Sequence, residues 1–188
     1  MIRFPARGWV GGRDINELVS NVDIVPTLLE TLGLPPSDRV QGRSAADLLD
    51  GAAPVHDRSA VFAEMTYHQY YDPRRCIRTE RHKLILNFST AKEFMDPSQS
   101  WRPRSTPRSP LTGAGAYHVV LELYDLESDP HELDNRAHDE SLAPVRDELL
   151  RRLGTWMTET NDPLLAGAVP CPAHLRAVAT LHRAEATS

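Results

Sequence analysis

Hydrophobic residues recur at helical spacing most clearly over 141–160, where apolar side chains follow one another at steps of three and four. Such spacing places them on one face, so we predict a helix over 141–160 that packs one side against a core. Pro144 falls in its first turn, where a missing backbone N–H costs nothing. Residues 20–33 form a second helical pattern, with Pro26 in the first turn and Gly33 as a stop.

Shorter elements are predicted around these two helices. A helix over 44–50 should end at Gly51, and residues 2–4 read as the end of a strand. Apolar runs bounded by polar turns predict further short strands at 61–65, 76–78, 84–86 and 121–126. Short strands beside one amphipathic helix indicate an α+β fold, a small antiparallel sheet packed by the long C-terminal helix.

Two stretches are predicted to be irregular. Residues 89–118 are rich in Ser, Pro, Arg and Gly, and we predict a long loop there, of the kind that is functional or mobile. Prolines are frequent after residue 162, and residues 166–188 are predicted to be an irregular tail.

Net charge and the lengths of the apolar runs limit the kinds of partner that we expect. A net charge of −5 and a pI near 5.9 give no reason to expect nucleic acid. No apolar run reaches the ~18 residues that a membrane helix needs, and residues 1–5 contain no signal-peptide core. The two cysteines, Cys76 and Cys171, are compatible with one disulfide or with two thiols. The sequence therefore assigns no compartment.

Five sequence blocks, in order along the chain, are similar to blocks of the sulfatase family, which belongs to the alkaline phosphatase superfamily. They are V-S-x-x-D-I-x-P-T-L from Val19, G-R-S from Gly42, R-T-x-x-x-K-x-I from Arg78, E-L-Y-D-L-x-x-D-P-x-E-x-x-N from Glu122, and the helix around Trp156. Thr66-Tyr67-His68 and the segment 156–163 look closest to sulfamidase-like (N-sulfoglucosamine sulfohydrolase-like) members.

The resemblance implies hydrolysis of a sulfuric ester or an N-sulfate, with a sulfated carbohydrate or aryl sulfate as substrate. It also implies a Ca²⁺ ion and a formylglycine made from Cys or Ser in C/S-x-P-S/A-R. That motif is absent, because Cys76 precedes Ile-Arg-Thr and Cys171 precedes Pro-Ala-His. Ser105 begins a near miss in which Arg and Ser are exchanged.

We therefore predict the C-terminal portion of a sulfatase, inactive as an isolated chain. Residues 1–55 would be a remnant of the catalytic α/β domain and 56–165 the C-terminal subdomain, followed by the tail 166–188. No catalytic residue, metal ligand or cofactor is assigned to this chain; Ca²⁺ and formylglycine are expected in the full-length family enzyme.

His68 and Glu64 are the candidate substrate-binding residues. The resemblance implies that the loop holding His68 faces the pocket mouth, where an imidazole would pair with an anionic sugar. Glu64 would bind a sugar hydroxyl or amine. A solvated loop histidine and a solvated strand-end carboxylate are the plain alternatives.

Other charged groups have structural interpretations. Asp125, Asp129 and Glu132 do not match the spacing of an EF-hand and suit turns better than calcium. The arginines at 74, 75 and 78 would either attract a sulfated polyanion or be plainly solvated. Asp23 is expected to be structural.

Two other functions remain open at this level. One is a non-catalytic remnant or binding module, and the other is a phosphoester hydrolase of the same superfamily, with Thr or Ser as nucleophile and two metals. We also expect self-association through the 20–33 helix, which would expose Leu28, Leu29 and Leu32.

Overall fold

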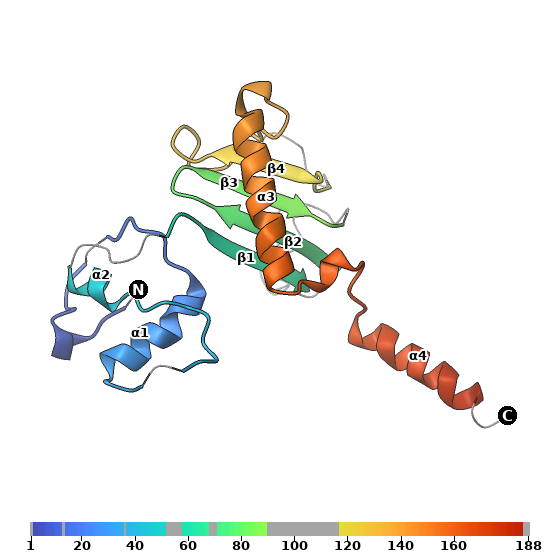
Figure 1. Ribbon diagram of the computed structural model, residues 1–188, viewed down its shortest axis with the longest axis horizontal. Helices are drawn as coiled ribbons and strands as arrows, with labels where there is room; N and C mark the ends of the chain where they lie inside the picture. Colours follow the sequence, from blue (N-terminus) through green and yellow to red (C-terminus); the bar gives the residue numbers. More distant parts are fainter. Residues whose placement is uncertain are drawn as a thin grey trace, which may run out of the picture. The chain divides into compact units, whose positions relative to one another are not determined.

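The computed structural model describes residues 2–12, 14–35, 37–51, 58–67, 71–89 and 117–185 (Figure 1). The chain splits into two compact units. One comprises Met1–Phe62 with Arg78–His82, and the other Ala63–Ile77 with Lys83–Ser188. The domain boundaries drawn from the sequence stay predictions.

A four-stranded antiparallel sheet has the strand order β1-β2-β3-β4. The strands are β1 (Val61–Tyr67), β2 (Tyr71–Arg78), β3 (His82–Asn87) and β4 (Leu121–Asp125). Helix α3 (Ala143–Glu159) lies across one face of this sheet (Figure 1). The core consists of fully buried residues from the helix and the sheet, namely Leu149, Leu153, Met157, Ile77, Leu84 and Leu123. The α+β prediction is confirmed, as are the four strands and the long helix.

Helix α3 starts as the sequence predicts. A 3₁₀ turn, η4 (Glu140–Leu142), precedes it, and the Asp139 carboxylate accepts a hydrogen bond from the backbone N–H of Ser141 at 2.8 Å. Pro144 lies in the first turn, where no helical partner is lost.

The first unit contains α1 (Ile24–Thr31), preceded by the 3₁₀ turn η2 (Asn21–Asp23), and α2 (Ala46–Asp50). Gly33 has φ 66° and ends α1 in a Schellman motif. The motif consists of the bonds from Gly33 N to Glu30 O (3.0 Å) and from Leu34 N to Leu29 O (2.8 Å). Gly51 ends α2 with φ 83°. Both helices are confirmed.

Two predictions are wrong. Residues 2–4 form no strand; Phe4 makes only an isolated bridge to Trp9 around the 3₁₀ turn η1 (Pro5–Arg7). The tail predicted to be irregular contains helix α4 (Pro172–Glu185). Its proline stands at the first helical position, where proline is tolerated, and alanines favour the helix that follows. Residues 90–116, most of the predicted long loop, lie outside the described residues.

None of the helices in the described part of the chain is long and apolar enough to cross a bilayer.

Candidate functional site

Asp23 joins distant parts of the first unit. Its carboxylate accepts hydrogen bonds from the backbone N–H of Ser20 (2.7 Å) and of Arg43 (2.9 Å), and it receives both arms of the Arg58 guanidinium. Burial alone would raise the pKa of Asp23, but the bonds from Arg58, Arg43 and Ser20 outweigh it and lower the pKa. The predicted structural role is confirmed.

Thr27 extends the same connection. Its hydroxyl donates to the Asp23 carbonyl at 2.6 Å and accepts from the backbone N–H of Ala45 at 2.9 Å. The D-I-x-P-T and G-R-S blocks are therefore one structural unit, built around a buried carboxylate and a buried hydroxyl. Neither group is open to a ligand, since Asp23 and Thr27 are both fully buried.

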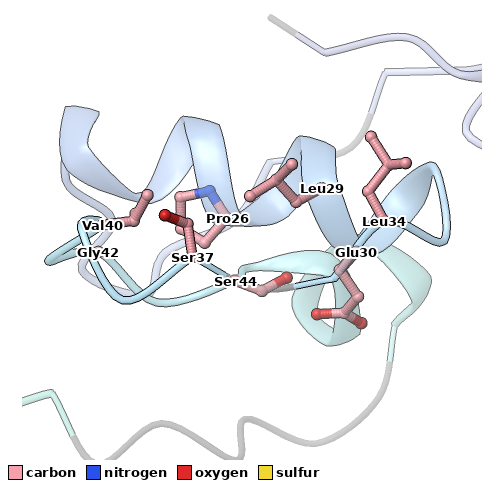
Figure 2. Close-up of a pocket in the computed structure, with 8 residues that line it drawn as sticks. All are labelled: Pro26, Leu29, Glu30, Leu34, Ser37, Val40, Gly42 and Ser44. Carbon is pink, nitrogen blue, oxygen red and sulfur yellow. The ribbon is translucent and has the colours of Figure 1, made fainter.

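A cavity of about 410 Å³ lies between α1 and the segment 37–44 (Figure 2). In Figure 2, Pro26 lies near Val40 at one end of the cavity, and Leu29 and Glu30 lie toward the other end. The remaining lining residues are Leu34, Ser37, Gly42 and Ser44. A mostly apolar lining with one carboxylate offers no grouping for catalysis or for holding a sulfate.

One residue of the predicted exposed face of α1 is not exposed. Leu28 is 48% exposed and Leu32 59% exposed, as expected, together with Val25 and Ile24. Leu29 is half-buried instead, because it turns toward the cavity.

Arg75 is a deeply buried charged side chain of the second unit. Only 1% of its side chain is exposed, and the same is true of its partner Asp162. The guanidinium binds both oxygens of that carboxylate, through Nε and through Nη2 (2.9 Å to Oδ1). The pKa of Asp162 is lowered, chiefly by this hydrogen bonding. Neither sequence interpretation of the arginine group, a polyanion site or solvated charge, holds for Arg75.

The same guanidinium fixes the end of β1. Nη1 donates to the carbonyl of Met65 at 2.9 Å, and Nη2 donates to the hydroxyl of Thr66 at 3.2 Å. Its Nε also lies 3.7 Å from the carboxylate of Glu64, whose side chain is 63% exposed. Of the two predicted substrate-binding residues, Glu64 is thus an exposed carboxylate beside a buried arginine. His68 lies outside the described residues.

Tyr67, the last residue of β1, is anchored as well. Its hydroxyl donates to the carbonyl of Val169 at 2.6 Å, and the N–H of Val169 donates to the hydroxyl of Tyr71 at 3.2 Å. The strand end that precedes His68 is therefore held from two sides, by Arg75 and by the segment that follows η5 (Pro163–Leu165).

A second polar cluster gathers around Glu122 of β4. Its carboxylate accepts hydrogen bonds from Asn87 Nδ2 (2.6 Å) and from the Tyr124 hydroxyl (2.7 Å), and it lies 3.7 Å from Nδ1 of His118. Burial would raise the pKa of Glu122, but hydrogen bonds from His118, Tyr124 and Asn87 prevail and hold it at about 2.

His118 lies between opposite charges. Its Nε2 is 2.6 Å from Nη2 of Arg74, which in turn pairs with Asp72. A guanidinium has only donors and keeps its proton, so Nε2 must be the acceptor. The contact therefore favours the Nδ1–H tautomer of His118, with that N–H toward Glu122. Two buried atoms of the cluster, Arg74 Nε and Asn87 Oδ1, have no partner among the described residues.

The turn carboxylates have the structural roles that their spacing favours. Asp129 Oδ2 accepts from the backbone N–H groups of Leu133 (2.7 Å) and Asp134 (2.9 Å), and Glu132 pairs with Lys83 at 2.6 Å. Across the described ranges, no group of three or more His, Cys, Asp or Glu side chains is placed to hold a metal ion. The described residues do not fit the calcium that the family resemblance implies.

Cys76 and Cys171 are not joined as a disulfide. The interpretation as two thiols is the one that the structure supports.

Comparison with known proteins gives a consistent match. Residues 1–99 match the family described as N-sulphoglucosamine sulphohydrolase, C-terminal. An ulvan-active sulfatase of Formosa agariphila is 28% identical over 167 residues, covering 86% of this chain and 33% of the relative. Human N-sulphoglucosamine sulphohydrolase is 29% identical over 169 residues, covering 77% of this chain and 33% of the relative. The chain thus spans about a third of the length of these curated relatives.

Solved structures agree on the fold. A structure of a 2-O GAG sulfatase superposes with a TM-score of 0.55 at 23% sequence identity, covering 77% of this chain and 26% of that one. At this identity the likeness establishes the fold alone.

Proposed function

Because the chain belongs to the N-sulphoglucosamine sulphohydrolase C-terminal family, we propose that it supplies part of the sugar-binding surface of a sulfatase. The observation that carries the proposal is the family match over residues 1–99, which include both Glu64 and His68. The relatives are named for ulvan and for N-sulphoglucosamine. The substrate class we propose is accordingly a sulfated sugar, with an N-sulfated glucosamine as the first compound to test.

Glu64 and His68 are the proposed contacts. Glu64 ends in an exposed carboxylate, which accepts hydrogen bonds from sugar hydroxyls. His68 follows four residues later and, when protonated, would pair with the sulfate. Together they would select a ring that has both hydroxyl and sulfate groups.

The sulfate-cleaving step is not assigned to these residues. No C/S-x-P-S/A-R motif occurs in the 188 residues. We propose that the Ca²⁺ and the formylglycine expected of the family enzyme are held by residues outside this sequence. The isolated chain should bind the sugar without hydrolysing it.

Self-association is a further proposal, based on the exposed face of α1. Leu28 and Leu32 leave much apolar surface in water, which favours burial against a second copy. Sedimentation velocity should show concentration-dependent association, and Leu28→Ser with Leu32→Ser should abolish it. A chain that stays monomeric over a hundredfold concentration range (about 1–100 μM) would contradict this proposal.

The sugar proposal is tested by titration with glucosamine N-sulfate, with glucosamine as the matched unsulfated control. Chemical-shift changes on binding should appear with the sulfated sugar and be weaker with glucosamine. Glu64→Gln and His68→Ala should each weaken binding about tenfold, as expected for the loss of one charge-assisted contact. Equal responses to both sugars, or wild-type affinity in both variants, would refute it.

A further inference from the structure

We infer that Arg75 and Asp162 are positioning residues, which hold the end of β1 in the geometry that sugar binding by Glu64 requires. This inference rests on the proposed function, and it adds two buried residues that would not touch the sugar.

The hydrogen-bonding capacity of the Arg75 guanidinium is fully used. Nε and Nη2 bind the Asp162 carboxylate, Nη1 donates to Met65 O and Arg74 O, and Nη2 also donates to Thr66 Oγ1. Every N–H of the guanidinium therefore has an acceptor. A buried cation satisfied in this way has one orientation, since any rotation would leave a donor unpaired in the core.

Several of these contacts connect Arg75 to β1. Three of the groups that surround the guanidinium belong to consecutive residues of β1, at 64, 65 and 66. Two of them are ordinary hydrogen-bond partners, the Met65 carbonyl and the Thr66 hydroxyl. Arg75 thus fixes the backbone on the C-terminal side of Glu64 and the approach to residue 68.

Arg75 is itself held in place by Asp162. Asp162 follows α3, and its backbone N–H donates to the Met157 carbonyl at 2.8 Å. Its Oδ1 also accepts from the N–H of Leu164 at 3.0 Å, which caps η5. Because Met157 is fully buried in the α3 core, the carboxylate is a rigid reference point for the strand end.

The charges around Arg75 are consistent with a positioning role. The guanidinium is matched by the buried carboxylate of Asp162, while Glu64 is 3.7 Å away and 63% exposed. Glu64 is therefore not consumed as the main counter-ion of Arg75, and its carboxylate stays open toward a ligand.

A double-mutant cycle tests the inference. Arg75→Lys keeps the charge but cannot make the bidentate pair or reach β1 at the same time. It is combined with Glu64→Gln, and the Kd for glucosamine N-sulfate is measured by NMR titration for both single variants and the double variant. Arg151→Lys, the same change on the exposed face of α3, is the matched control. Thermal melting establishes that each variant is folded.

The inference predicts that Arg75→Lys and Glu64→Gln each weaken binding about tenfold, and that the double variant is at most about twofold weaker than Glu64→Gln alone. Losses that multiply to about a hundredfold would overturn the inference while leaving the role of Glu64 intact. Wild-type affinity in Glu64→Gln would instead overturn the proposed sugar contact, and the inference with it.

A milder variant covers the case in which Arg75→Lys does not fold. Thr66→Val removes one acceptor at the strand end and leaves the ion pair with Asp162 in place. It should weaken sugar binding by a few-fold in the wild type and have no effect in Glu64→Gln. An equal loss in both backgrounds would overturn the inference.

Discussion

The backbone of Gly42 approaches that of Val22 so closely that a Cβ at position 42 would lie 1.9 Å from the Val22 carbonyl oxygen. Next to this approach, the N–H of Arg43 donates to the Asp23 carboxylate. The glycine of the G-R-S block is therefore required by close packing onto the D-I-x-P-T block. Both blocks stabilise the first unit, and neither forms an exposed site.

Gly42→Ala should lower the free energy of unfolding by about 3 kcal/mol, because the new methyl group clashes with backbone that cannot easily move. Urea denaturation measures the change. Gly11→Ala is the control, since nothing lies within 4 Å of a Cβ there. A loss at Gly42 no larger than that at Gly11 would show that the two blocks are not in contact.

Lowering the pH should remove the contribution of Glu122 to the free energy of unfolding. Its carboxyl pKa falls from an ordinary 4.5 to about 2 in the folded chain. The contribution is therefore complete above about pH 4.5 and is lost as the pH falls toward 2. We expect the stability difference between wild type and Glu122→Gln to shrink by about 2 kcal/mol over that range, allowing for screening by solvent. Glu80→Gln, on an exposed turn, is the control; a difference that does not change with pH would contradict the prediction.

His118 should be the Nδ1–H tautomer. The reason is that Arg74 donates to Nε2, so a proton there would place two donors 2.6 Å apart. Imidazole ¹⁵N shifts from long-range ¹H–¹⁵N correlation distinguish the tautomers. Arg74→Met removes the donor and should allow the Nε2–H form. An Nε2–H imidazole in the wild type would show that the Arg74 contact is absent in solution.

Gly154→Ala should stabilise the chain by about 1 kcal/mol. Gly154 lies inside α3, a Cβ there meets nothing within 4 Å, and alanine favours a helix over glycine. Gly167→Ala is the opposite test. A Cβ at Gly167 also meets nothing within 4 Å, but its φ of 135° is one that residues with a side chain rarely adopt. The melting temperature should rise for the first variant and fall for the second; the same sign in both would refute the explanation.

The sequence predicted most elements because their apolar spacing is local. Helix α3, the strands and both glycine stops follow from spacing and turn residues alone. The sequence does not predict helix α4 because prolines are frequent after residue 162, although Pro172 stands where a helix can begin. The buried pair of Arg75 and Asp162 was missed because its members are 87 residues apart. One local signal for it existed, since Arg75 shares a strand face with buried Pro73 and Ile77.

The candidate site was only partly predictable for a similar reason. Glu64 occupies an exposed position of β1, but the arginine behind it comes from the neighbouring strand β2. The spacing of residues along the sequence indicates which of them share one face of a strand. It does not indicate which other strand lies beside that strand.

The most direct test of the account follows glucosamine N-sulfate and the chain in one NMR sample. Saturation-transfer difference reports contact with the sugar, and the appearance of free glucosamine reports loss of the sulfate. We predict saturation transfer to the sulfated sugar with no release of glucosamine over a day. Release of glucosamine would contradict the assignment of cleavage to residues outside this sequence, and an absence of saturation transfer would contradict sugar binding by this chain.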